Sequence, residues 1–191
     1  MSAEPRPTDH ERPLTARVFF ALQPPEALAR VLADVARQAA EQQGGRPTRC
    51  ATIHLTLAFL GDVPVADLPV LEALGEGLRG LRFSLRIDRL GYWPNKRLLW
   101  AGLSEVPDGL RYVQRQLLAA LAAAGYRTDP AGRGFAPHLT LVRRLPPDGA
   151  AALVAGGLRP LDWPCSSFAL FRSDPGASGP EHIVLREFPL A

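Results

Sequence analysis

The same tetrapeptide, His-Leu-Thr-Leu, occurs at His54–Leu57 and again at His138–Leu141. The chain has only four histidines and seven threonines, so a His-x-Thr pattern is expected about 0.15 times by chance. Alternate residues of a β-strand share a face, which places each His beside its Thr and turns the leucines towards the core. The repeat therefore predicts two equivalent strands, each presenting an imidazole and a hydroxyl.

The predicted elements follow the same order in the two halves of the chain, and each motif lies on the third element of its half. Strands are predicted at Arg17–Gln23, Thr52–Leu60, Phe83–Leu90, Arg97–Leu103, Pro137–Arg143, Trp163–Arg172 and His182–Phe188, and helices at Leu28–Ala39, Val65–Arg79, Leu110–Leu121 and Asp148–Ala155. The second strand is expected to close at Gly61-Asp62. Because the chain ends in successive strands, this order indicates an α+β fold rather than a doubly wound parallel sheet. We expect two lobes related by a pseudo-twofold axis, with antiparallel sheets around a central cleft that both motifs line.

Length and composition favour one folded domain. A chain of 191 residues, 47% of them apolar, buries a sufficient core without disulfides or a structural metal. Cys50 and Cys165 are too far apart in the sequence for a metal knuckle or a disulfide framework. We expect a flexible tail over residues 1–15 and a single bilobal domain, with interleaved lobes, over residues 16–191. The chain has no 18-residue apolar stretch and no signal-peptide pattern, so we expect a cytoplasmic protein without a membrane span. We also expect a monomer.

The charged residues are unusual in kind rather than in number. Basic residues outnumber acidic ones by 22 to 19, and all of them except Lys96 are arginines. Guanidinium groups bind phosphate through paired hydrogen bonds, which favours a phosphate-binding protein. Compositional bias of a genome produces the same excess, and a net charge of +3 does not decide between the two explanations.

Two imidazoles can supply both an acid and a base near neutral pH, because the unperturbed pKa of histidine is about 6.5. One ring would activate water for attack on a phosphoester, and the other would protonate the departing oxygen. The hydroxyls of Thr56 and Thr140 would donate hydrogen bonds to the non-bridging oxygens. The motifs hold only two histidines and no carboxylate, so we expect no metal and no other cofactor. The alternative is that each motif is the solvent face of an amphipathic strand.

Several segments carry a resemblance to a known family: Arg17–Leu22 (RVFFAL), His54–Gly61 (HLTLAFLG), Leu99–Gly102 (LWAG) and Phe135–Arg143 (FAPHLTLVR). The chain resembles the 2H phosphoesterase superfamily and, within it, the RNA 2',3'-cyclic phosphodiesterases, also called 2'-5' RNA ligases. The resemblance implies two related α+β lobes around a central cleft. It also implies RNA or oligonucleotide ends as partners, and an activity that opens a terminal 2',3'-cyclic phosphate to a 2'-phosphomonoester.

The resemblance assigns different roles to the two motifs. It makes His54 the proton donor to the leaving O3' and His138 the proton acceptor that activates water. Arg143 lies five positions after His138, where the family carries an arginine that meets the phosphate, whereas Phe59 occupies the matching position after His54. The halves are therefore not chemically equivalent, as distinct acid and base roles require. The alternative for Arg143 is a surface arginine at the end of a strand.

Other residues near the motifs are weaker candidates. Phe135 is a candidate for stacking on a terminal base, or else an aromatic of the core or a hinge. Candidates for the rim of the cleft are Arg133, Arg144, Tyr92 and Trp93. His182 has no Thr two residues on and His10 lies in the tail, so both are predicted to be structural or solvated.

Two other functions fit the same residues. The reverse reaction would join tRNA halves through a 2'-5' bond, although water at about 55 M favours hydrolysis. A non-catalytic module would recognise an RNA end or a nucleotide through the same cleft, although arginines alone would serve a pure binder.

Overall fold

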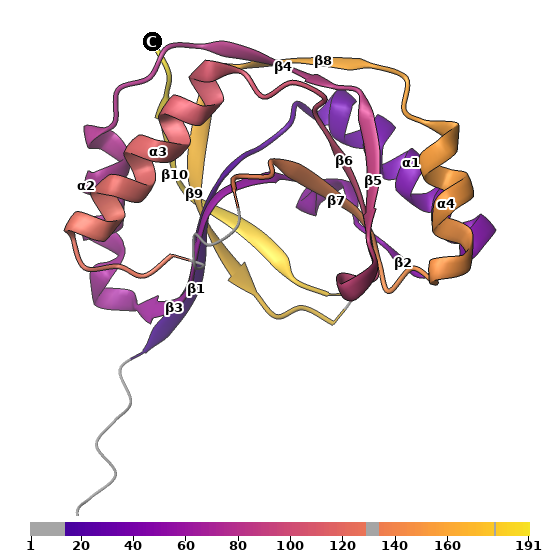
Figure 1. Cartoon of the computed structure of the whole chain (residues 1–191). Coiled ribbons are helices and arrows are strands. Elements are labelled where there is room, and N and C mark those ends of the chain that lie inside the picture. The colour runs from indigo at the N-terminus through magenta and orange to yellow at the C-terminus, as the bar shows by residue number, and fades with distance from the viewer. Residues whose placement is uncertain (1–13, 129–133, 178) are drawn as a thin grey trace, which may run out of the picture.

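The structure, a computed structural model, describes residues 14–128, 134–177 and 179–191, and in these ranges it contains one eight-stranded sheet, one two-stranded sheet and four α-helices (Figure 1). The strands are β1 Thr15–Leu22, β2 Arg46–Pro47, β3 Leu55–Pro64, β4 Phe83–Ile87, β5 Arg89–Trp93, β6 Leu98–Gly102, β7 His138–Arg143, β8 Leu161–Cys165, β9 Ser167–Asp174 and β10 Glu181–Pro189. The α-helices are α1 Glu26–Gln43, α2 Leu68–Gly77, α3 Asp108–Ala123 and α4 Pro147–Gly156, with 3-10 turns η1 Cys50–Thr52, η2 Val65–Asp67 and η3 Pro94–Lys96. The predicted α+β class with antiparallel sheets is confirmed.

The ends of the chain limit two of the predictions. Of the tail predicted over residues 1–15, residues 1–13 lie outside the described part of the chain, whereas Thr15 already pairs with Pro64 in the main sheet. Within the described ranges, no helix combines the length and the apolar character that a membrane span needs.

The two motif strands are neighbours at the centre of the main sheet. The strand order is β10-β9-β1-β3-β7-β6-β5, and β2 also pairs with β7. Strands β3 and β7 run antiparallel and pair through Leu55 and Leu139. Both leucines are fully buried, so the two halves of the sheet meet at an apolar pair that belongs to the repeated motifs themselves.

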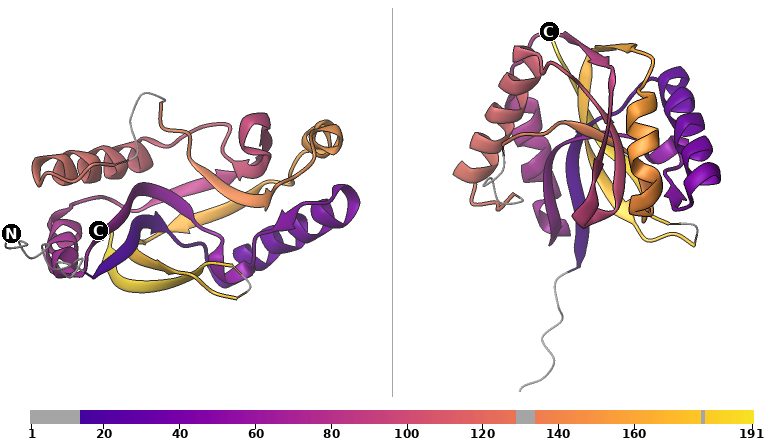
Figure 2. Two further views of the ribbon diagram at one scale, coloured as in Figure 1. Left: turned by 90° about the horizontal axis from the view of Figure 1, so that it is seen from below. Right: turned by 45° about the vertical axis from the view of Figure 1, so that its right-hand side comes forward.

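The helices cross from one half of the fold to the other. Helix α1 follows β1 in sequence but packs against β7, β2 and α4, and helix α3 follows β6 but packs against β3 and α2. In Figure 1 the pair α2 and α3 lies to the left of the central strands and the pair α1 and α4 lies to the right. Figure 2 shows from two further sides that the strands run between these pairs. Each half therefore supplies a helix to the half formed by the other.

Apolar residues at helical spacing explain this packing. The residues of α1 that face the core are Leu28, Ala29, Leu32, Ala36 and Ala39, and those of α3 are Leu110, Val113, Leu117 and Leu121. Such spacing puts one stripe of each helix against the sheet. A proline immediately precedes each of these two helices, as is common at helix starts.

Two predicted strands are each divided between the two sheets. The segment Phe83–Leu90 breaks at Asp88, whose carboxylate accepts hydrogen bonds from the Ser104 backbone N–H (2.8 Å) and hydroxyl (2.6 Å). The segment Trp163–Arg172 breaks at Ser166, whose carbonyl accepts a hydrogen bond from Leu190 N–H. In each case the first part, β4 or β8, leaves the main sheet, and these two strands pair with each other. The prediction that each segment forms a single strand was therefore wrong.

Strand β3 does not close at Gly61-Asp62 as predicted. It continues to Pro64, and Leu60 is the extra residue of a β-bulge between the pairs Val18–Gly61 and Phe19–Phe59. Gly61 has φ 75°, a conformation that glycine adopts without a steric penalty. The glycine therefore bends the strand instead of ending it.

The buried pair of Leu55 and Leu139, where the two halves of the sheet meet, gives a first prediction. We expect Leu139→Ala to lower the free energy of unfolding by about 2–5 kcal/mol, because it leaves a cavity at the centre of the sheet. Leu81→Ala is the control: Leu81 is 75% exposed, and we expect a change below about 0.5 kcal/mol. Urea denaturation followed by circular dichroism measures both. Similar small effects of the two substitutions would contradict the packing of this pair.

Candidate active site

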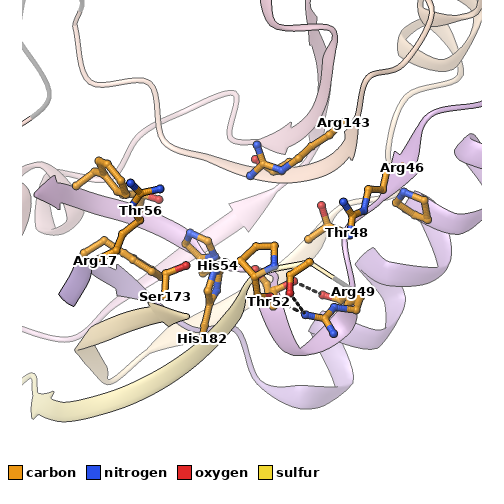
Figure 3. A pocket seen from close by; sticks show the side chains of 16 residues that line it. Arg17, Arg46, Thr48, Arg49, Thr52, His54, Thr56, Arg143, Ser173 and His182 are labelled. Carbon is orange, nitrogen blue, oxygen red and sulfur yellow. Dashed lines mark hydrogen bonds between the residues drawn. The ribbon is translucent and has the colours of Figure 1, made fainter. Parts of the chain in front are cut away.

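A cleft of about 460 Å³ opens on the side of the main sheet where His54 and Thr56 lie. The pairing of Leu55 with Leu139 orients the motifs across it, because an antiparallel register centred on these leucines directs each His towards the Thr of the other motif. The residues that line the cleft are Arg17, Phe19, Arg46, Pro47, Thr48, Arg49, Thr52, His54, Thr56, Phe59, Thr140, Arg143, Ser173, Gly179, Pro180 and His182, and the main polar ones are labelled in Figure 3.

His54 lies just before β3 and is held by its own backbone. Its Nδ1 lies 2.8 Å from the carbonyl oxygen of Thr52. A carbonyl only accepts hydrogen bonds, so Nδ1 carries the proton and Nε2 is the nitrogen left for a ligand. Burial lowers the pKa of His54 to about 4, against the opposing effect of the Thr52 hydrogen bond, and the charges of His182, Arg143 and His138 lower it further. The His54 ring is therefore neutral at neutral pH in the free protein.

His138, the first residue of β7, has a matching environment. Its Nδ1 lies 3.0 Å from the carbonyl oxygen of Ala136, which fixes the same tautomer as in His54. The ring meets that of Trp93 edge to face at 4.5 Å, and it is not among the residues that line the cleft of about 460 Å³. Burial lowers the pKa of His138, and the charges of Lys96 and Arg143 add to this effect.

Each imidazole rests on a pair of aromatic rings. Phe19 lies 4.8 Å from the His54 ring and stacks on Phe171 at 5.2 Å with an interplanar angle of 9°. Trp93, beside His138, lies 5.4 Å from Trp100. The two supports come from different strands and different residue types, so the sequence repeat does not include them. The geometries also differ, because the His54 ring is tilted by 34° from Phe19 whereas the His138 ring meets Trp93 at 72°.

A β-bulge inside each motif explains why the residue five positions after each histidine, Phe59 or Arg143, faces the cleft. Leu57 is the extra residue between the pairs Ala21–Thr56 and Phe20–Ala58. Leu141 is the extra residue between the pairs Trp100–Thr140 and Leu99–Val142. Each bulge shifts the alternation by one residue, so Phe59 joins Thr56 on the cleft face and Arg143 joins Thr140 there.

Arg143 is the cation shared by the site. Its charge lowers the pKa of His54, His138 and His182. Partial desolvation and the neighbouring Arg46 lower the pKa of Arg143 itself, although an arginine stays charged throughout the physiological range. Within the described part of the chain no carboxylate forms an ion pair with it. The arrangement favours an anion at this place, since an anion would relieve the repulsion among these groups.

Two further arginines of the cleft are tied to neighbouring groups. Arg17 forms a two-point ion pair with Asp62, at 3.0 and 3.1 Å. Arg49 donates hydrogen bonds to the carbonyl oxygens of Pro180 (2.6 Å) and Gly179 (3.4 Å), which fastens the loop before β10. Figure 3 shows Arg49 on the opposite side of His54 and His182 from Arg17. The cleft wall is therefore positively charged and partly fixed before any ligand binds.

Comparison with known proteins identifies the family of this chain. A family model described as LigT like phosphoesterase matches residues 22–100, which include the first motif. A protein of Thermus thermophilus named RNA 2',3'-cyclic phosphodiesterase is 35% identical over 184 residues, which cover 91% of this chain and 90% of its own. The chain belongs to the LigT-like phosphoesterase family. The family resemblance predicted from the sequence is confirmed.

A protein and a crystal structure from Escherichia coli are also similar to this chain, the first in sequence and the second in fold. A K12 protein, also named RNA 2',3'-cyclic phosphodiesterase, is 32% identical over 139 residues, or 70% of this chain and 78% of its own. The crystal structure of E. coli LigT complexed with 3'-AMP superimposes with a TM-score of 0.80 at 26% identity, covering 93% of this chain and 99% of that one. The fold of this LigT-like phosphoesterase thus matches nearly the whole of a solved relative.

The other predicted site residues lie in different places. Phe135 is half-buried against the main core and does not line the cleft, a position that favours the core alternative over base stacking. Tyr92 donates a hydrogen bond to the carbonyl of Leu145 (3.0 Å), and Arg144 is exposed with φ 57°. Neither lines the cleft. Arg133 and His10 lie outside the described residues.

Sequence reasoning missed several residues of this LigT-like phosphoesterase cleft. Phe19 and His182 line it, although His182 was predicted to be structural or solvated. Phe59, 43% exposed, offers an aromatic face there. Its position five residues after His54 was the available signal. For His182 no local motif exists, because its place depends on the pairing of β10 with β9.

Carboxylates are scarce around the two histidines. The described residues contain no group of three or more His, Cys, Asp or Glu side chains placed to hold a metal ion. The cleft-lining set contains three kinds of group suited to a phosphate instead: imidazoles, hydroxyls and guanidiniums.

The lowered pKa of His54 predicts a pH dependence of stability. His54 of the unfolded chain takes up a proton below its pKa of about 6.5, whereas His54 of the folded protein does so only below its pKa of about 4. The free energy of unfolding therefore decreases as the pH falls from about 6.5 to about 4. In His54→Asn, whose amide can donate to the Thr52 carbonyl, we expect the loss to be smaller by up to about 3 kcal/mol. Urea unfolding at a series of pH values measures it. Parallel curves for the two proteins would contradict the buried, neutral His54.

Proposed function

We propose that this protein is an RNA 2',3'-cyclic phosphodiesterase, which hydrolyses terminal 2',3'-cyclic phosphates of RNA or oligonucleotides to 2'-phosphomonoesters without a metal. The relatives that carry this name support the class of reaction. The observation that carries the mechanism is the pair of imidazoles with matched Nδ1 hydrogen bonds, both under the charge of Arg143. E. coli LigT complexed with 3'-AMP supports a nucleotide ligand for this fold.

The proposed step uses one histidine for each proton. His138 Nε2 takes a proton from water as the water oxygen bonds to phosphorus. The bond from phosphorus to O3' breaks, and O3' receives the proton of His54 Nε2. Thr56, Thr140 and Arg143 donate hydrogen bonds to the non-bridging oxygens, where negative charge accumulates in the transition state. His138 then releases its proton to solvent, and His54 takes up a proton again when the next substrate binds.

The proton-donor role requires that His54 become charged when substrate binds. In the free protein its pKa is about 4, which leaves little imidazolium at neutral pH. A phosphodiester carries one negative charge, and an opposite charge beside a histidine raises the pKa. The anion would also offset the charge of Arg143. In this mechanism, substrate binding itself supplies the acid form of His54.

Substitution of either histidine tests the pair. We expect His54→Ala and His138→Ala each to lower kcat by at least about 10²–10⁴-fold, with unchanged circular dichroism, and EDTA to leave the wild-type rate unchanged. The assay is hydrolysis of an oligonucleotide with a 2',3'-cyclic phosphate end, with phosphorus NMR of the product. Full activity of either variant would exclude the mechanism. A 3'-phosphate product would reverse the two roles, and binding without turnover would favour a non-catalytic module.

The pH dependence of the rate tests the charging of His54. The value of kcat/KM reports the free enzyme, in which both histidines have lowered pKa values, so we expect its optimum below pH 6.5, the unperturbed value. The value of kcat reports the complex, in which the substrate anion raises these pKa values, so its optimum lies at higher pH. Steady-state kinetics at constant ionic strength measure both. Coincident optima above neutral pH would contradict this account.

A further inference from the structure

His182 is a titratable residue of the cleft to which the proposed reaction gives no role. It lies on β10, is partly buried and lines the cleft. Its partner in the sheet is Ser173 of β9, which lines the cleft as well. Figure 3 shows the His182 ring directly beside that of His54.

The His182 ring completes a cluster of three mutually contacting rings. The centroid of His54 lies 4.9 Å from that of His182 and 4.8 Å from that of Phe19, and Phe19 and His182 lie 5.0 Å apart. His182 meets both neighbours edge to face, at 77° and 71°. The His54 ring is thus confined by Phe19, by His182 and by its own hydrogen bond to Thr52. Loss of the His182 ring would open one side of this enclosure.

The cluster also couples two protonation equilibria. The other charged groups that face these rings are His138 and Arg143 on β7, Arg49 before η1 and, in the same cleft but paired with Asp62, Arg17 on β1. A protonated His182 would add one more positive charge directly against His54. Like charges at this separation oppose each other, and the pair then titrates in two steps.

We propose that His182 is a positioning residue for His54, whose ring it holds in orientation and whose protonation it opposes. A positive charge on either ring disfavours a positive charge on the other, because the two rings are in contact. An anion in the cleft would offset this repulsion and favour the protonated form of His54. The proposal rests on the proposed function in one respect, that His54 is the proton-transfer group.

Two variants separate the ring from the charge. His182→Phe keeps an aromatic edge against His54 but cannot be protonated, so we expect a higher pKa of His54 and a kcat within about threefold of wild type. His182→Ala removes the ring, and we expect kcat to fall about 10–100-fold, because small misplacements of a reacting group have effects of this size. Ile183→Ala is the matched control: Ile183 is the next residue of β10, is exposed and should change neither quantity.

NMR titration of the imidazole resonances in the free protein measures the pKa of His54, and steady-state kinetics measure kcat. An unchanged His54 titration in His182→Phe would overturn the coupling, and wild-type kcat in a folded His182→Ala would overturn the positioning role. Should His182→Ala fail to fold, the His54 titration in His182→Phe decides. If the wild type hydrolyses no cyclic phosphate but the His54 pKa still rises in His182→Phe, the proposed function fails and the coupling stands.

Discussion

The pairing of Leu55 with Leu139 sets the geometry on which the rest of the site depends. It joins the two halves of the main sheet at its centre, and each leucine directly follows one of the two histidines. A shift of one residue in this register would place the two imidazoles on opposite faces of the sheet. Helices α1 and α3 pack against β7 and β3, the strands that carry these leucines, and their apolar residues belong to the same core, so core packing and site geometry depend on the same strand pair.

Electrostatics in the cleft are arranged for an anion that arrives from outside. Arg143 acts on three histidines at once, and burial keeps the pKa of His54 at about 4. In such a site most of the positive charge is carried by arginines, which cannot lose it, while the His54 ring is neutral at neutral pH in the free protein. The excess of arginine over lysine, by itself ambiguous, has a local meaning at Arg143 and Arg49, where guanidinium groups face the cleft or fasten its wall.

The two halves share a backbone plan but differ in chemistry. Both motifs contain a bulge at the second leucine, and both histidines bond to the carbonyl two residues earlier. The residue that each bulge turns into the cleft is Phe59 in one half and Arg143 in the other. A titratable ring, His182, lies beside His54, whereas the ring beside His138 is Trp93, whose centroid lies 5.2 Å from Lys96 Nζ. The two motifs thus have similar backbone conformations but place their imidazoles in different surroundings, as the proposed acid and base roles require.

The sequence alone determined the elements that depend on local patterns. The repeated motif, the amphipathic helices and the order of strands predicted an α+β fold with two histidines and two threonines on related strands, because periodicity reports which face is buried. Three features depended on tertiary structure. The breaks at Asp88 and Ser166 arise from hydrogen bonds to residues distant in sequence. The bulges that turn Phe59 and Arg143 inward appear only against the partner strands. His182 reaches His54 only through the sheet, since neither a motif nor a spacing can encode contact between strands that pairing alone brings together.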